Sequence, residues 1–176
     1  LCKKILTVEI MGKHSNIIFC DDKGTILDSI KHVSAHMSSV REVLPGRPYF
    51  IPHTQEKCDP LTITEETFLN QVFQKPLPLG KALYTNLTGI SPLVAEEICY
   101  RASLESSQIA NTFSDLERIH LFHTFTLLME DVRGGVFTPN IIYQGKEPVA
   151  FSSISLTQYR DCRREVYPDI SQVLES

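Results

Sequence analysis

Residues 7–33 read TVEIMGKHSNIIFCDDKGTILDSIKHV, and this stretch decides the first part of the fold. Two apolar runs rich in Ile, Val and Phe flank a short polar segment, MGKHSN at 11–16. The DDKG sequence at 21–24 is typical of a tight turn between antiparallel strands. We therefore predict three consecutive strands that form a meander, with MGKHSN as its first turn.

A proline-rich stretch follows at residues 34–62. It contains four prolines, a density that excludes a helix and predicts an extended, ordered loop. Its apolar side chains are expected to be buried, because an ordered loop needs packing contacts. These side chains are Val40, Val43, Leu44, Tyr49, Phe50 and Ile51.

Capping residues and the helical spacing of apolar side chains predict four helices after this loop. The first begins near a threonine, the third at Ser91 with Pro92 in its first turn, and the fourth at Ser114. A glycine pair at 134–135 ends the fourth helix. The four segments are TITEETFLNQVFQ at 62–74, KPLPLGKALYTNL at 75–87, SPLVAEEICYRAS at 91–103 and SDLERIHLFHTFTLLMEDVRGG at 114–135.

Strand patterns return near the end of the chain. FTPNIIYQGKEPVAFSSISL at 137–156 predicts a hairpin around QGKEP, and the final DISQVLES has the pattern of a helix start. This order predicts an α+β fold, in which a β-rich lobe, made of the meander and the returning C-terminal hairpin, carries an inserted helical subdomain. The expected parts are residues 1–61 (β-rich), 62–135 (helical) and 136–176 (returning strands).

The composition is that of an ordinary globular protein. Of the 176 residues, 42% are hydrophobic and 22% charged, and no apolar stretch approaches the roughly 18–20 residues of a membrane span, so no membrane contact is expected. Residues 1–58 carry eight Lys or Arg against six acids, whereas residues 59–176 carry nine against fifteen. An anion site is therefore expected as a local patch, in the first third of the chain.

Cysteines and histidines are expected to have structural roles. The five cysteines include no CxxC pair, and their odd number argues against a zinc site and a disulfide framework. Cys20 and Cys99 fall in apolar patterns and are expected to be buried, in a reducing compartment. His32 and His36 lack a third metal ligand and are expected as a surface or hydrogen-bonded pair, and His123 as a core histidine.

Catalytic signatures are missing from the sequence. It contains no Walker loop, GxGxxG, GxSxG or carboxylate pair with obvious chemistry. We expect no catalytic residues, no metal and no cofactor, so the chain is predicted not to be an enzyme.

The MGKHSN turn has two interpretations. It can be an ordinary polar turn, or an anion-binding turn in which Gly12 and the following amides form a concave donor site. In the second interpretation Lys13 supplies charge and His14, Ser15 and Asn16 supply polar contacts.

Arg41 and Arg47 flank a rigid turn in VREVLPGRPY. A guanidinium suits two-point contacts with phosphate, but each arginine could instead pair with a nearby acid such as Glu42 or Asp28. If Arg41, Arg47, Lys13 and His14 act together, they are expected to form one basic surface with salt-sensitive RNA binding.

LTGISP at 87–92 has the pattern of a helix-hairpin-helix turn. Gly89 would permit close backbone approach, and the amides after Ser91 could hold a phosphate at the start of the next helix. Lys81, one helix earlier, could add charge. The alternative is a plain helical hairpin that serves only for packing.

Four segments occur in a characteristic order: EIMGKHSNIIF, GTILDSIKHV, SSVREVLPGRPYFIP and LTGISPLVAEEI. Together they closely resemble the NFACT family, whose bacterial members are called fibronectin-binding protein A-like proteins or RqcH. The resemblance implies a first domain with a fold similar to formamidopyrimidine DNA glycosylases, a helix-hairpin-helix region, a coiled coil and an RNA-binding domain. This chain would hold the later part of the first domain and the hairpin region, and DISQVLES would lead into the coiled coil.

The resemblance also implies a function. Family members act in ribosome quality control, bind tRNA and the stalled large ribosomal subunit with its peptidyl-tRNA, and support alanine tailing of nascent chains in the cytoplasm. The older family name implies the alternative of a cell-surface adhesin that binds fibronectin or fibrinogen. A third hypothesis, a glycosylase-type enzyme, needs a nucleophile and an acid in one cleft, and the sequence supplies neither.

Overall fold

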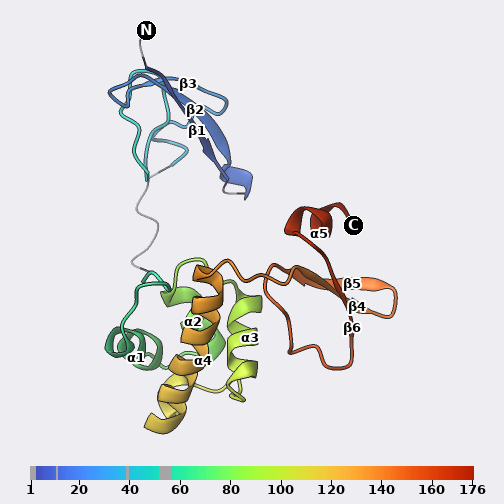
Figure 1. Ribbon diagram of the computed structural model, residues 1–176. Coiled ribbons are helices and arrows are strands. Elements are labelled where there is room, and N and C mark those ends of the chain that lie inside the picture. Colours follow the sequence, from blue (N-terminus) through green and yellow to red (C-terminus); the bar gives the residue numbers. More distant parts are fainter. Residues whose placement is uncertain (1–2, 11, 39, 52–56) are drawn as a thin grey trace. The chain divides into compact units, whose positions relative to one another are not determined.

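The computed structural model describes residues 3–10, 12–38, 40–51 and 57–176 (Figure 1). The chain divides into two compact units, residues 1–55 and residues 56–176. Strands and extended loop make up the first unit, whereas the second contains all five α-helices of the described residues together with a second sheet. The mixture of helices and two antiparallel sheets confirms the predicted α+β class.

The first unit contains the predicted meander (Figure 1). Its strands are β1 (Ile5–Glu9), β2 (Asn16–Cys20) and β3 (Ile26–Ser29), antiparallel in the order β1–β2–β3. A single 3₁₀ turn, η1 (Gly12–His14), joins β1 to β2, and the turn at 21–24 joins β2 to β3. A bulge lies where Phe19 and Cys20 pair with β3.

One face of this sheet forms a small core. Ile18, Cys20, Ile26 and Val43 are buried together, with Tyr49 packed against them. The loop after β3 runs back along the sheet, with bridges from Thr25 to Pro48 and from Val33 to Val43. Successive residues of a strand point to opposite faces of the sheet. The residues of β1 and β2 that point away from this core are exposed. These exposed side chains are Leu6, Val8, Ile17 and Phe19.

The prediction of a well-buried loop at 34–62 was only partly correct. Val43 is buried and Tyr49 is half-buried, but Val40, Phe50 and Ile51 are exposed. Backbone hydrogen bonds to the sheet hold the loop together with the packing of Val43 and Tyr49. Gly46 N donates to Ile26 O at 2.8 Å, and Tyr49 N donates to Gly24 O at 2.8 Å.

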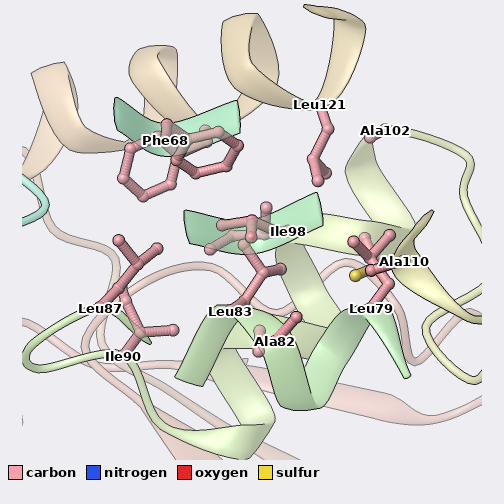
Figure 2. Packing of buried hydrophobic residues seen from close by; sticks show 14 of the residues in the cluster. Phe68, Leu79, Ala82, Leu83, Leu87, Ile90, Ile98, Ala102, Ala110 and Leu121 are labelled. Carbon is pink, nitrogen blue, oxygen red and sulfur yellow. The ribbon is translucent and has the colours of Figure 1, made fainter. Parts of the chain in front are cut away.

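Four helices of the second unit share one apolar core, which Figure 2 shows around Phe68, Leu83 and Ile98. Side chains of Thr64, Ser91 and Ser114 cap three of them, as the sequence predicts. Ser114 and Glu117 complete a capping box. The helices are α1 (Glu65–Phe73), α2 (Leu79–Asn86), α3 (Pro92–Arg101) and α4 (Asp115–Arg133), and the short η2 (Ala110–Thr112) precedes α4.

His123 is exposed, so its prediction as a core histidine was wrong. Leu121, Phe125 and Leu128 form the buried stripe of α4. A residue two positions from both Leu121 and Phe125 lies on the opposite side of a helix with 3.6 residues per turn. The spacing of Leu121, His123 and Phe125 in the sequence therefore already indicated that His123 is exposed.

The C-terminal hairpin forms its own sheet. β4 (Asn140–Gln144) pairs with β5 (Glu147–Ser152) as predicted, but also with β6 (Arg163–Val166), which was not predicted. The sheet order is β5–β4–β6, within the second unit. Within the described residues, the hairpin is therefore part of a sheet separate from β1–β2–β3. The predicted C-terminal helix start is α5 (Ile170–Glu175), capped by Asp169.

A buried ionic network joins α3 to the segment after β5. The Glu97 side chain is fully buried, and its oxygens accept hydrogen bonds from Arg101 Nε (2.7 Å), Thr157 Oγ1 (2.6 Å), Thr157 N (2.8 Å) and Gln158 N (3.0 Å). Arg101 also donates to Ser155 O at 2.6 Å. These bonds hold the segment at 155–158 against the helical core.

Candidate nucleic-acid interface

The MGKHSN turn presents two cationic side chains to solvent. Its residues 12–14 form one 3₁₀ turn, in which Ser15 N donates to Gly12 O at 3.0 Å, while Met11 lies outside the described residues. Gly12 has a φ of +54°, a conformation that glycine adopts without steric cost. Lys13 and His14 are exposed, so the turn can offer charge and hydrogen bonds to an anionic partner.

Asn16 follows this turn as the first residue of β2. Its side chain is 6% exposed and bonds the backbone of Lys31 twice: Nδ2 donates to Lys31 O and Oδ1 accepts from Lys31 N, each at 2.9 Å. The amide is thus occupied in holding the end of β3 beside the start of β2.

Lys31 was missed by the sequence reasoning. Its Nζ donates to Lys13 O at 3.1 Å, which places a second lysine beside the turn. The signal was indirect: in a three-stranded meander, the end of the third strand lies next to the start of the second. Lys13, His14 and Lys31 therefore gather at one end of the sheet.

Arg41 lies in a closed, buried network. Its side chain is 8% exposed, forms an ion pair with Glu9, and donates from Nη1 to Phe50 O at 2.6 Å. Tyr49 Oη donates to Glu9 Oε1 at 3.0 Å, and the Arg41 guanidinium carbon lies 5.6 Å from the centre of the Tyr49 ring. Burial, followed by the bond to Glu9, raises the pKa of Tyr49 above its usual value. The network ties the long loop to β1.

Arg47 lies apart from the other cations. Its Nε is 2.9 Å from Glu42 Oε2, the local pairing that the sequence left open. Its carbonyl accepts from Ile26 N, and Ile26 pairs with Cys20, at the far end of β2 from Asn16. The structure therefore does not gather Arg47 with Lys13 into one basic surface.

In the second unit, the LTGISP turn joins α2 to α3 tightly. Gly89 has a φ of +74°, with open space where a Cβ would stand. Ser91 Oγ accepts from Val94 N at 3.2 Å and caps α3. Lys81 is exposed on α2. The exposed glycine leaves the backbone of this turn accessible to a ligand.

A pocket of about 350 Å³ opens next to this turn. Its walls come from the Thr88–Ile90 turn, the second half of α4, and residues beside β5. The wall of α4 is formed by Leu128, Met129 and Val132. Such a lining suits an apolar group rather than a phosphate.

Among the histidines and cysteines outside these sites, Cys20 and Cys99 match their predicted burial, whereas His123 does not. His32 Nε2 lies 3.0 Å from Asp28 Oδ1, and this contact lowers the pKa of the Asp28 carboxyl. Cys20 and Cys99 are buried, and burial raises the pKa of the Cys99 thiol to about 12. The four cysteines within the described ranges are free thiols, and Cys2 lies outside them. Nowhere in those ranges do three or more His, Cys, Asp or Glu side chains form a group suited to a metal ion.

Comparison with known proteins gives a match over the full chain. A family model described as the NFACT N-terminal and middle domains matches residues 1–176. The chain belongs to the NFACT family. The family resemblance stated from the sequence is thus confirmed. None of the described helices is both long and apolar enough to cross a bilayer.

Curated relatives of this NFACT chain include bacterial Rqc2 homologs named RqcH. RqcH of Bacillus subtilis (strain 168) is 34% identical over 172 residues, which cover 97% of this chain and 28% of that protein. RqcH of Streptococcus pneumoniae serotype 2 (strain D39 / NCTC 7466) is 38% identical over 94 residues, covering 53% of this chain and 17% of that protein. The chain thus spans less than a third of the curated relatives it matches.

Solved structures share the NFACT fold. The fibrinogen binding protein from Staphylococcus aureus superposes with a TM-score of 0.74 at 27% identity, over 98% of this chain and 58% of that chain. The N-terminal part of the fibronectin/fibrinogen-binding protein from Streptococcus suis superposes with a TM-score of 0.65 at 23% identity, over 99% of this chain and 56% of that one. The second likeness concerns the fold alone.

Proposed function

We propose that this chain is part of a ribosome quality-control factor that binds tRNA and the stalled large ribosomal subunit with its peptidyl-tRNA, and supports alanine tailing of nascent chains. The observation that carries the proposal is the 34% identity to RqcH over 97% of the chain. In this role the chain is a cytoplasmic binding module without catalytic residues or cofactor.

In the first unit, the RNA contact would come from the exposed end of the meander. Lys13, His14 and Lys31 supply cations and donors there, and Ser15 lies beside them. The side chains of Asn16 and Arg41 are hydrogen-bonded within the unit, so they act by holding the start of β2 to Lys31 and the long loop to β1. Arg47, paired with Glu42 at the other end of the sheet, would contribute less. Phosphate contacts from a few exposed cations give weak, salt-dependent binding.

In the second unit, the helix-hairpin-helix turn would hold a phosphate of the same RNA class. Gly89 leaves the backbone open, and Leu93 N is the amide left to donate to a phosphate in the first turn of α3, because Pro92 has no N–H and Val94 N donates to Ser91 Oγ. Lys81 would add charge from α2.

Co-sedimentation of the full chain with purified large ribosomal subunits and bulk tRNA, at two salt concentrations, tests the proposal. We expect binding that weakens with salt and weakens further in Lys13→Ala/Lys31→Ala, by about tenfold for two phosphate contacts. Lys23→Ala is the matched control, because Lys23 is an exposed lysine in the turn at the other end of the sheet. A wild-type chain that sediments with neither subunits nor tRNA would refute the proposal.

A second candidate function is adhesion to fibrinogen or fibronectin. The structural match to the Staphylococcus aureus fibrinogen binding protein favours it. Protease accessibility on intact cells and binding to immobilised fibrinogen separate the two functions: an adhesin is cleaved on intact cells and binds fibrinogen, whereas a ribosome-associated factor is protected.

A further inference from the structure

We propose that Arg160 and Arg164, placed beside Arg101, form an RNA-backbone contact in the second unit, where the overall charge is negative. The inference rests on the proposed RNA-binding function and adds a surface to it. The segment YRDCRR at 159–164 contains three of the nine Lys and Arg residues between 59 and 176. Three structural observations show which of its arginines are available.

The first observation concerns Ser155. Arg101 Nη2 donates to Ser155 O at 2.6 Å, and Arg164 Nη1 donates to Ser155 Oγ at 2.9 Å. Because both guanidiniums bond atoms of the same residue, they lie near each other. Like charges at this proximity repel, and an anion between or above them relieves the repulsion.

The second observation is the position of Arg160. Its guanidinium carbon lies 5.1 Å from the centre of the Tyr100 ring, and its Nε donates to Tyr100 Oη. The contact holds an exposed side chain in one orientation, so that less conformational entropy is lost when it binds a ligand. Tyr100 precedes Arg101 on α3, so the Arg160 contact begins next to the Ser155 cluster. The Cα atoms of Arg160 and Arg164 are at most about 14 Å apart, because the two residues are four positions apart in the chain.

The third observation is charge compensation. Arg101 is paired with the buried Glu97, and Arg163 with Glu165. Across residues 57–176, neither Arg160 nor Arg164 has a carboxylate within ion-pair distance. Both are exposed. They are therefore two guanidiniums that no carboxylate neutralises and that hydrogen bonds hold in place. Two exposed acids limit the net charge of the surface: Asp161 follows Arg160 in the sequence, and Glu96 precedes Arg101 by five positions.

Arg163 provides an internal contrast. It lies between Arg160 and Arg164 in the sequence. Successive residues of a strand point to opposite faces of its sheet, so Arg163 and Arg164 of β6 lie on different faces. Arg163 pairs across the sheet with Tyr143, and its guanidinium carbon lies 4.4 Å from the centre of that ring. Arg164 pairs across the sheet with Ile142 and reaches Ser155 instead. The face of the sheet, rather than the charge of the segment, therefore distinguishes the two arginines.

These features suit an RNA phosphate backbone. A guanidinium offers a planar fork that matches phosphate, and a fixed pair of forks can contact successive phosphates of one strand. Bases of single-stranded RNA can also stack on guanidinium planes. Two uncompensated charges predict modest affinity with a strong dependence on salt.

The test measures binding of the full chain to bulk tRNA and to a mixed-sequence single-stranded RNA at several salt concentrations. We expect Arg160→Ala/Arg164→Ala to lose about tenfold in affinity and to reduce the salt slope by about 1 to 2, close to one contact for each arginine. Arg163→Ala removes one positive charge from the other face, against two in the double variant, and should leave both quantities near the wild-type values. Arg160→Lys/Arg164→Lys should keep the slope while losing part of the affinity, because lysine retains charge but not the fork.

The outcomes separate the inference from the proposed function. If the wild-type chain binds RNA and large subunits, and the double alanine variant matches it in affinity and slope, the inference is overturned and the proposed function stands. Equal losses of RNA affinity in Arg163→Ala and in the double variant would also overturn the inference. The losses would then come from the overall charge of the chain rather than from this surface. A polyglutamate peptide that competes as well as RNA would assign the surface to an acidic protein partner instead. Failure of the wild-type chain to bind RNA or large subunits would remove both proposals.

Discussion

Among the described residues, each unit holds a glutamate with a largely buried side chain that bonds an arginine, yet the two carboxylates are supported differently. Glu9 in the first unit is bonded by two side chains, those of Arg41 and Tyr49. Glu97 in the second unit is bonded by Arg101, by the Thr157 hydroxyl and by two backbone amides. Glu97 would therefore keep three donors without its arginine, whereas Glu9 would keep one.

Removing the better supported carboxylate is expected to have the largest effect. Glu97→Ala should lower the free energy of unfolding of the second unit by about 3–5 kcal/mol, since it leaves Arg101 without its ion pair and two backbone amides without their acceptor. Urea unfolding followed by far-ultraviolet circular dichroism reports this unit, because all the described α-helices belong to it. Glu96→Ala, at the exposed neighbouring position, should change stability by no more than about 0.5 kcal/mol. A Glu97→Ala effect as small as that control would show that the network contributes nothing.

In the first unit, loss of the arginine is expected to be almost as costly. Arg41→Ala leaves Glu9, with only 9% of its side chain exposed, bonded to Tyr49 alone. The cost should be about 3 kcal/mol, measured as faster amide hydrogen exchange in β1 and β2. Arg47→Ala is the matched control: the Arg47 side chain is 58% exposed in its pair with Glu42, so its loss should cost about 0–1 kcal/mol. Similar effects from the two variants would contradict the distinction between a buried and a surface arginine.

Arg101→Ala sharpens the comparison. It should cost less than Arg41→Ala, about 1–2 kcal/mol, because Thr157 and Gln158 still donate to Glu97 and because the Arg101 side chain is 25% exposed. The measurement is the same helical unfolding transition used for Glu97→Ala. If Arg101→Ala costs as much as Glu97→Ala, the arginine supports the carboxylate more than the backbone amides do.

The comparison also shows what the sequence could reveal. Arg47 and Glu42 are five residues apart, and the local pair was anticipated, whereas Arg41 and Glu9 are 32 residues apart. Capping by Ser91 and Ser114 was predictable because a cap bonds within its own first turn. Ion-pair partners that are far apart in the sequence meet only when the strands pair, and the pairing of strands depends on contacts throughout the fold.

The same distinction, between partners that are near and far in the sequence, explains why β6 and the positions of its arginines were not predicted. Alternation predicted β4 and β5, which are joined by a tight turn, but β6 reaches β4 only after a long connection. Without β6 there was no reason to assign Arg163 and Arg164 to opposite faces.

An exposed glutamate gives the smallest expected effect and completes the comparison. Glu117 accepts from the hydroxyl and the amide of Ser114, and these two bonds lower the pKa of its carboxyl below the usual 4.5. Because the folded pKa is depressed, the stabilisation is present above pH 4.5 and is lost as the pH falls through the folded pKa. The stability difference between wild type and Ser114→Ala should therefore be constant near neutral pH and shrink below pH 4.5. Unfolding followed by circular dichroism between neutral and acidic pH measures it. A difference that grows on acidification would mean that the cap acts without the Glu117 carboxylate.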